Sequence, residues 1–245
     1  MNPAEKSKFI SNWIKNYVEQ MPNKAESLVI GISGGIDSSV SSTLSAMTGL
    51  RTIVLSMPIK QKSAHHDLSI AHQEWLKKNY QNVEGHLIEL DTLFKSFEGT
   101  LNNFSNEHGM ANSRARLRMT TLYQVAAANK GIVVGTGNKV EDFGVGFYTK
   151  YGDGGVDISP IADCNKTEVW ELGKELGILE EIINAAPTDG LWDDGRTDEG
   201  QLGLSYKELE EAMNNENSVN RERYNSIRNA NLHKMEPIPV CKIPN

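Results

Sequence analysis

Residues 33–39 (SGGIDSS) follow an apolar run at 28–32, and their types and spacing predict a site for a phosphate group. Gly34 and Gly35 let the backbone come close to a ligand, and the N–H groups at the start of a following helix attract an anion. Asp37 places a carboxylate inside this loop. Because a bare carboxylate would repel phosphate oxygens, Asp37 indicates a Mg²⁺ ion between the two. The loop therefore predicts a nucleotide and a divalent metal together.

The same spacing argues against the commonest nucleotide-binding enzymes. It matches neither G-x-x-x-x-G-K-[ST] nor G-x-G-x-x-G, so a P-loop hydrolase and a dinucleotide-dependent dehydrogenase both lose their main support. The alternative is an ordinary Asp or Ser cap on a glycine turn. The run of small and hydroxylic residues directly after a strand favours the phosphate site.

A second glycine-rich stretch, at residues 135–157, carries further charged residues after an apolar run at 132–134. Glu141 could give a metal its second oxygen ligand, and Lys150 or Lys166 could neutralise a departing pyrophosphate. Taken alone, Glu141 would be interpreted as a solvated surface residue. Together with Asp37 at a neighbouring strand end, it is better explained as a metal ligand.

Apolar periodicity predicts the elements that must position these residues. After a first, core-facing helix that ends near Pro22, strands alternate with helices, which indicates an α/β protein with a doubly wound parallel sheet. Ligands bind at the carboxyl ends of such strands, so the loops at Ser33 and Thr136 face one crevice. The predicted strands are 28–32, 52–56, 86–90 and 132–135, the helices include 9–18, 68–78 and 114–129, and the connections at 60–66, 99–110 and 188–204 are expected to act as lids.

Length and composition limit the function classes. At 245 residues we expect one domain over 1–245, and the net charge of −7, from 25 Lys+Arg against 32 Asp+Glu, disfavours nucleic acid or an anionic membrane as a partner. Cys164 and Cys241 lack C-x-x-C spacing, which excludes a zinc ribbon and predicts two buried thiols in a reducing compartment. No run of about 18 apolar residues occurs, so we expect a cytoplasmic protein.

Several motifs stand in the order of the NAD synthetases of the N-type ATP pyrophosphatase group, and the chain resembles that family from about residue 9 to residue 237. The motifs that carry the resemblance are residues 33–38, residues 112–119 (NSRARLRM), Gly135-Thr136, Glu141, residues 149–155 (TKYGDGG) with Asp157, Lys166, Pro187-Thr188, Thr197-Asp198-Glu199 and His233-Lys234. So many ordered matches are not explained by chance.

The resemblance implies an adenine nucleotide alpha hydrolase-like fold, Rossmann-like and three-layered, with helical N- and C-terminal additions. It implies amidation of nicotinate adenine dinucleotide (deamido-NAD) to NAD by ATP, Mg²⁺ and ammonia, through an acyl adenylate with release of pyrophosphate and AMP. The site residues it implies are Gly31, Ile32, Ser33, Gly34, Gly35, Ile36, Asp37, Ser38, Thr136, Lys166 and Thr188 for ATP; Asp37 and Glu141 for Mg²⁺, with Lys166 as the third catalytic residue; and Arg116, Lys150, Asp157, His233 and Lys234 for the nicotinate nucleotide.

Three further expectations follow from the resemblance. Free ammonia is the implied nitrogen donor, because a glutamine-dependent form needs an amidase domain for which 245 residues leave no room. Family members are typically homodimers, so a homodimer is expected. The nicotinate mononucleotide remains open as the substrate, which would make the enzyme an NMN synthetase, because the usual H-K-R motif is here His233-Lys234-Met235 and lacks a bidentate arginine.

Two rival classes are also open. Other pyrophosphatase-group enzymes, such as a GMP synthetase core or a tRNA-modifying enzyme, share the loop at 33–39 but not the segment at 149–157. A module that binds ATP without turnover would not require Glu141 and Lys166 in addition to Asp37. The segment and the two extra residues favour the synthetase.

Overall fold

A four-stranded parallel sheet, with helices on both faces, organises the chain in the computed structural model, which describes residues 1–60, 63–192 and 195–244. The strands are β1 (Ser27–Gly31), β2 (Thr52–Ser56), β3 (Val83–Leu87) and β4 (Gly131–Val133), in the order β3-β2-β1-β4. The chain leaves β1 toward β2 and later returns to the other side of β1 with β4. This reversal of direction beside β1 confirms the predicted doubly wound α/β class and marks the place where such sheets bind ligands.

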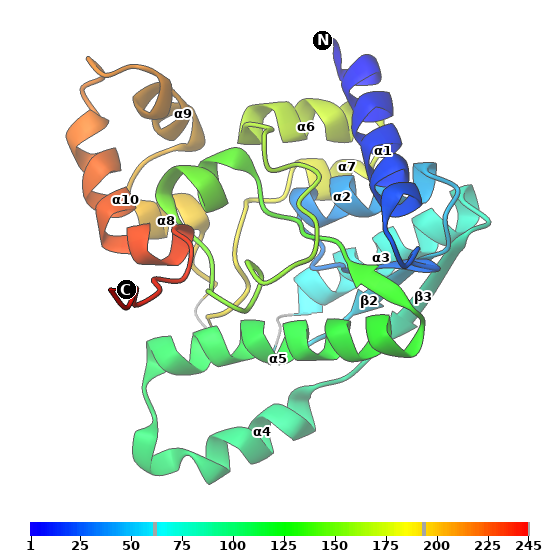
Figure 1. Ribbon diagram of the computed structural model, residues 1–245, viewed down its shortest axis with the longest axis horizontal. Helices are drawn as coiled ribbons and strands as arrows, with labels where there is room; N and C mark the ends of the chain where they lie inside the picture. The colour runs from blue at the N-terminus through cyan, green and yellow to red at the C-terminus, as the bar shows by residue number, and fades with distance from the viewer. Residues whose placement is uncertain (61–62, 193–194, 245) are drawn as a thin grey trace.

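Side chains that alternate along the strands create two cores. Leu28 and Ile30 of β1 face a core that includes α1 (Pro3–Gln20), α2 (Ile36–Met47), α3 (Ser63–Asn79), α6 (Lys166–Glu175) and α7 (Glu180–Ile183). Val29 faces the opposite core, which α4 (Asp91–Thr100) and α5 (Glu107–Ala128) cover (Figure 1). The central strands β1 and β2 are buried on both faces, as is typical of a parallel sheet, whereas in the edge strand β3 only Val83 is buried.

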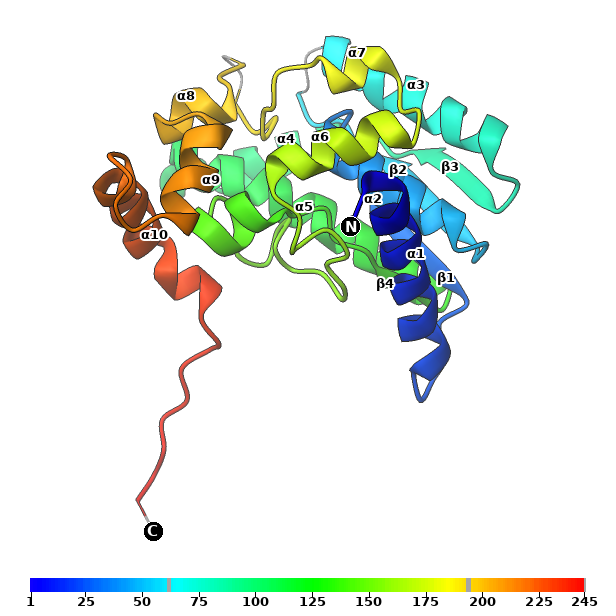
Figure 2. The same ribbon diagram turned by 90° about the horizontal axis from the view of Figure 1, so that it is seen from above.

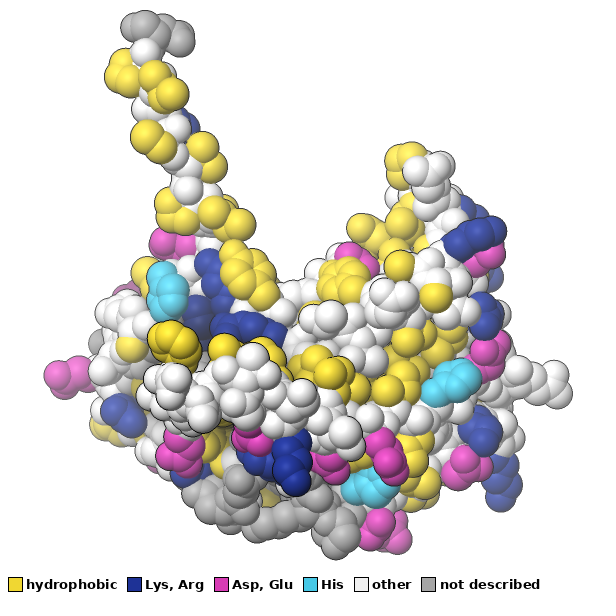
Figure 3. All heavy atoms as spheres, turned by 90° about the horizontal axis from the view of Figure 1, so that it is seen from below, with side chains coloured by type: hydrophobic (Ala, Val, Ile, Leu, Met, Phe, Trp, Pro, Cys, Tyr) yellow, Lys and Arg dark blue, Asp and Glu magenta, His cyan; other side chains and the backbone are white. Residues whose placement is uncertain are grey.

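The C-terminal addition is a separate helical layer beside the sheet. It comprises α8 (Asp198–Leu202), α9 (Tyr206–Asn214) and α10 (Arg221–Met235), which pack with the π-helix η2 (Lys139–Val145) around Val140, Tyr206 and Tyr224. A short 3₁₀ turn, η1 (Asn102–Phe104), links α4 to α5. After α10 the chain extends away from the body on one side of a hollowed face (Figures 2 and 3).

Two strand boundaries were predicted wrongly. The third strand is Val83–Leu87 rather than 86–90, because Ile88 and Leu90 belong to the connection into α4, where Leu90 is buried against the helix core. The fourth strand is Gly131–Val133 rather than 132–135, because Val134 donates its backbone N to the carbonyl of Val29 at 2.9 Å but is paired as an isolated bridge with Ile158 rather than within the strand. In both places apolar residues continue past the end of the strand, so periodicity misplaced the boundary.

The first helix runs over Pro3–Gln20, and only half of its apolar stripe faces the core. Ile10, Ile14 and Val18 are buried, whereas the predicted core-facing aromatics Phe9, Trp13 and Tyr17 are exposed. The prediction of two buried thiols was also half wrong, since Cys164 is buried and Cys241 is exposed on the C-terminal extension.

The expected lids are not plain loops. Residues 99–110 contain η1 and the start of α5, and residues 188–204 contain α8. Residues 61–62 and 193–194 of the expected lids lie outside the described residues. In the described part of the chain, no helix has the length and apolar character needed to cross a membrane.

Candidate active site

A cavity of about 240 Å³ opens beside β1 and β4, at the carboxyl ends of the strands. Every residue that the sequence assigned to ATP lies on its wall: residues 31–38, Thr136, Lys166 and Thr188. Glu141 lines the same cavity. The fold thus brings together segments from β1, from the end of β4, from α6 and from the connection before α8.

Hydrogen bonds made by serine hydroxyl groups within the loop between β1 and α2 hold the loop in its conformation. Gly34 has a φ of 90°, a left-handed conformation that favours glycine. Ser38 Oγ accepts a hydrogen bond from the backbone N of Ser33 at 3.2 Å and donates one to the carbonyl of Gly35 at 3.0 Å. No described side chain caps α2, which begins at this loop, so its first N–H groups and the positive end of its dipole are available to an anion.

A buried lysine joins the two carboxylates that were predicted to bind metal. The Nζ of Lys166 lies 2.5 Å from Asp37 Oδ2 and 2.8 Å from Glu141 Oε1. The lysine side chain is 1 % exposed, and the carboxylate side chains are 18 % and 14 % exposed. Burial alone would lower the pKa of Lys166, but the charges of Asp37 and Glu141 outweigh it and raise that pKa above its ordinary value. Lys166 is therefore a cation shared by both carboxylates at neutral pH.

The geometry of Asp37 and Glu141 around Lys166 indicates whether the two carboxylates fit a divalent cation. The ammonium group of Lys166 is a stand-in cation, since both carboxylates already direct oxygens at one positive centre. Among the described residues no group of three or more His, Cys, Asp and Glu side chains converges as a metal site. Mg²⁺ commonly takes one or two protein carboxylates and completes its shell with phosphate oxygens and water, so the pair fits that ion.

Neutral donors hold each carboxylate in place. Asn138, fully buried, donates from Nδ2 to Asp37 Oδ1 at 3.0 Å, and its Oδ1 accepts from the backbone N of Glu141 at 3.1 Å. The hydroxyl of Tyr206 donates to Glu141 Oε1 at 2.5 Å. Neither residue was predicted from the sequence. The position of Asn138, directly after the Gly-Thr-Gly that follows a strand, was a usable signal, whereas nothing local marked Tyr206.

The hydroxyl of Tyr206 also lies 3.2 Å from Asp198 Oδ2. Burial and the charges of Glu141 and Asp198 raise the pKa of Tyr206, so the phenol remains a donor. A phenol has one hydrogen, and the shorter contact with Glu141 takes it. Burial, together with the charge of Glu141, raises the pKa of Asp198 to about 7, so a proton on Asp198 can complete the second contact.

Arg118 is a further cavity residue that the site prediction omitted. Its Nε donates to the carbonyl of Met57 at 3.0 Å, and its Nη2 is buried without a partner among the described residues. Burial, helped by the charge of Arg114, lowers the pKa of Arg118 to about 10, which leaves it cationic at neutral pH. Arg114 and Arg118 are four residues apart on one face of α5, whereas Arg116 lies on another, so helical spacing lets only part of this trio reach one ligand.

Four of the residues assigned to the nicotinate nucleotide form a second group outside this cavity. The Nε of Arg116 donates to the carbonyl of Lys150 at 3.2 Å, and Lys150 Nζ donates to the carbonyl of His233 at 3.1 Å. Lys234 Nζ donates to the carbonyl of Tyr148 at 2.8 Å. These contacts gather α5, the loop at 148–151 and the end of α10 into one positively charged cluster.

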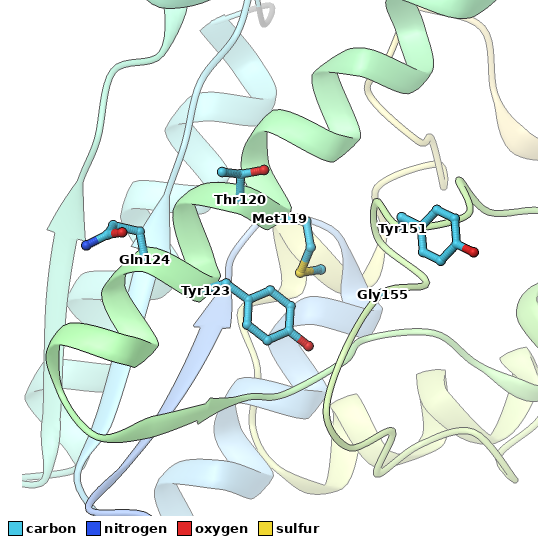
Figure 4. A pocket seen from close by; sticks show the side chains of 6 residues that line it. All are labelled: Met119, Thr120, Tyr123, Gln124, Tyr151 and Gly155. Atoms are coloured by element: carbon cyan, nitrogen blue, oxygen red, sulfur yellow. The ribbon is translucent and has the colours of Figure 1, made fainter.

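Asp157, the fifth residue of that set, lies at the edge of the sheet. Its Oδ2 accepts from the backbone N of Val133 at 2.7 Å, and its Oδ1 accepts from the hydroxyl of Tyr123 at 3.0 Å. Tyr123 lines an open groove between α5 and the facing loop, to which Met119 and Tyr151 also contribute (Figure 4). Asp157 therefore already binds β4 and α5, and it reaches the groove through Tyr123.

Comparison with known proteins agrees with this geometry. The model of the NAD synthase family matches residues 7–242. The NH(3)-dependent NAD(+) synthetase of Carboxydothermus hydrogenoformans is 36 % identical over 220 residues, which cover 86 % of this chain and 85 % of that protein.

Two solved structures are similar over almost all of both chains. NMN synthetase from Francisella tularensis is 33 % identical with a TM-score of 0.90, covering 99 % of this chain and 100 % of the other. The NH3-dependent NAD synthetase from Campylobacter jejuni is 23 % identical with a TM-score of 0.79 and the same coverage, a likeness that speaks for the fold alone. The family match over nearly the whole chain, with a relative at 36 % identity, shows that the chain belongs to the NAD synthase family.

Proposed function

We propose that the protein is an ammonia-dependent NAD synthetase that converts deamido-NAD to NAD with ATP and Mg²⁺. The carboxylate of the nicotinate attacks the α-phosphorus of ATP, and pyrophosphate leaves. Ammonia then attacks the acyl carbon, AMP leaves, and the new amide nitrogen loses a proton. The observation that carries the proposal is the cavity in which Asp37, from the loop at 33–38, and Glu141 share one buried cation.

The protein's part in this reaction is to hold the phosphates and balance their charge. The loop hydroxyls and the N–H groups at the start of α2 would hold the ATP phosphates, with Thr136 and Thr188 on the cavity wall beside them. Lys166 would release the carboxylates and neutralise the departing pyrophosphate. Asp37 and Glu141 would hold Mg²⁺, which supplies Lewis-acid stabilisation of the phosphate charge when bound.

The experiment that tests this proposal is a product assay with defined components. Purified protein, ATP, Mg²⁺, an ammonium salt and deamido-NAD should yield NAD, AMP and pyrophosphate in equal amounts, with NAD identified by mass. An ATP-binding module without turnover would release no pyrophosphate with any nicotinate acid. That result would contradict the enzyme assignment.

A second candidate substrate, the nicotinate mononucleotide, is favoured by one specific feature. Where the family pattern has an arginine after His-Lys, Met235 packs its sulfur toward Gly146, and the neighbouring Arg228 donates to the carbonyl of Phe143 at 2.7 Å. No guanidinium at position 235 is thus available for a second phosphate or ribose. The similar Francisella tularensis protein is an NMN synthetase. Ratios of kcat/KM for the two acids decide between the candidates, and a strong preference for the dinucleotide would remove the second.

We infer a homodimer as the working form. The support is the exposure of Phe9, Trp13 and Tyr17 along one face of α1, and of Ile238 and Val240 on the C-terminal extension, which are apolar surfaces of the kind that association buries. Light scattering coupled to size-exclusion chromatography should give twice the monomer mass. A monomer at assay concentration would contradict the inference.

A further inference from the structure

Glu141 meets a neutral hydrogen-bond donor that comes from the C-terminal helical layer. We propose that Tyr206 is a positioning residue: its hydroxyl fixes the carboxylate of Glu141 in the orientation a divalent cation needs and connects that carboxylate to α8. This inference rests on the proposed function, because it assigns Glu141 to the cation. Tyr206 itself would touch neither ATP nor the nicotinate nucleotide.

The contacts around Tyr206 fix its phenol ring firmly. Tyr206 is 1 % exposed and is the first residue of α9. Its ring meets Trp170 edge-on at 5.7 Å between centroids, and Lys166 Nζ lies 4.7 Å from the ring centroid. These contacts leave the ring little freedom to move. The hydroxyl is therefore held 2.5 Å from Glu141 Oε1.

Glu141 needs such a donor more than Asp37 does. Both carboxylates share Lys166, and Asp37 has a second donor in Asn138 at 3.0 Å. Asn138 also holds the backbone N of Glu141, but the longer glutamate side chain still has free torsions beyond Cα. If Lys166 turns toward a phosphate, Tyr206 is the donor that remains on Oε1, and the other lone pairs of the carboxylate stay available to the cation.

The same tyrosine connects the cation site to the segment that carries Thr188. The backbone N of Tyr206 donates to Glu199 Oε1 at 2.9 Å, and its hydroxyl lies 3.2 Å from Asp198 Oδ2. The backbone N of Asp198 donates in turn to the carbonyl of Pro187 at 3.0 Å. The position of Glu141 is therefore coupled, through Tyr206 and Asp198, to the position of Pro187, the residue before Thr188.

Tyr206→Phe keeps the ring and removes the hydroxyl, and with it the contacts with Glu141 Oε1 and Asp198 Oδ2. The matched control is Tyr224→Phe, a buried tyrosine of the same cluster whose hydroxyl bonds to none of the described residues. Mn²⁺ binding is followed by electron paramagnetic resonance with a non-hydrolysable ATP analogue, below the unfolding temperature of every variant. We expect the Kd for Mn²⁺ to rise at least about tenfold in Tyr206→Phe, as loss of a hydrogen bond to a charged group implies, and to stay within about twofold in the control.

Kinetics supply the second readout. The Mg²⁺ concentration for half-maximal rate should rise with the Mn²⁺ Kd, while the KM for the nicotinate nucleotide changes little. An unchanged Mn²⁺ Kd in Tyr206→Phe would overturn the positioning role, and so would an equal rise in the KM for the nicotinate nucleotide, which indicates general structural damage. Failure of the unmodified protein to bind Mn²⁺ with the ATP analogue would instead refute the proposed cation site itself.

Discussion

Replacement of Lys166 by Met is the sharpest test of the buried charge cluster. Methionine keeps most of the volume and removes the ammonium that Asp37 and Glu141 share at 2.5 and 2.8 Å. Removal of one partner from a buried ion pair costs about 3–5 kcal/mol, because an uncompensated charge stays buried. Here two carboxylates lose their cation at once.

Protonation of Asp37 or Glu141 sets an upper bound on the stability that Lys166→Met loses. The folded protein can relieve the repulsion by protonating one carboxylate, which at pH 7 costs about 3 kcal/mol for a group with an ordinary pKa near 4.5. The hydrogen bonds from Asn138 and Tyr206 favour the ionised forms and add to that cost. We therefore expect Lys166→Met to lower the free energy of unfolding by about 3–4 kcal/mol, which corresponds to a fall in Tm of about 10 °C for a chain of this size.

The assay is thermal and urea unfolding in EDTA and in excess Mg²⁺. The penalty should shrink as the pH falls toward about 5, because protonation of a carboxylate then becomes easier, and Mg²⁺ should restore part of the stability. The matched control is Lys139→Met, whose lysine pairs with Asp163 at 2.9 Å on the surface and should contribute less than about 1 kcal/mol. A Tm loss in Lys166→Met no larger than in the control would show that Asp37 and Glu141 do not depend on the Lys166 ammonium for stability.

Three further predictions concern other described residues. Asp37→Asn keeps the shape of the side chain but removes a ligand charge, so pyrophosphate release should fall at least about a hundredfold, whereas Tm should fall much less than in Lys166→Met because Glu141 still pairs with Lys166; a rate near that of the unmodified protein would contradict its metal role. Arg118→Met removes a buried cation whose Nη2 has no partner among the residues that the structure describes, so the KM for ATP or for the nicotinate nucleotide should rise about tenfold or more, and steady-state kinetics that leave both values unchanged would exclude a ligand contact. His72 is fully buried, and burial lowers its pKa to about 4 from an ordinary 6.5, so its contribution to stability is present above about pH 6.5 and is lost as the pH falls toward 4, by up to about 3 kcal/mol. The difference between urea unfolding of the unmodified protein and of His72→Gln should show that slope between pH 7.5 and 5, and parallel pH profiles would contradict it.

The strands and helices could be predicted where the apolar residues follow a clear pattern along the sequence. The first two strands came from unbroken apolar runs, which are typical of strands buried on both faces. The boundary of β3 was not predictable, because Ile88 and Leu90 are apolar for a reason that lies in the following connection and helix core. The prediction that the aromatic stripe of α1 faces the core was wrong for a similar reason. Periodicity shows that a helix has an apolar side but not which partner covers it.

The order of motifs predicted the candidate site better than the geometry of single residues did. Residues 31–38 were expected to meet Thr136 because parallel strands end at one edge of a sheet, and both line the cavity. The nicotinate residues were expected at one ligand, but the order of motifs did not predict that Arg116 Nε would donate to the carbonyl of Lys150 and Lys150 Nζ to the carbonyl of His233. Those bonds join segments that are far apart in the sequence, so no local pattern encodes them.

Local sequence is enough to predict the glycine-rich loop at residues 33–38 and the carboxylate within it, because the turn at Gly34 and the start of α2 depend on neighbours within a few residues. Which charges Asp37 shares depends on tertiary packing. Lys166 is 129 residues from Asp37 along the chain, and Tyr206 is 65 residues from Glu141, yet they meet at hydrogen-bond distance. A buried charge must find a partner wherever the fold supplies one, so the balance of the site is a property of packing that no local pattern encodes.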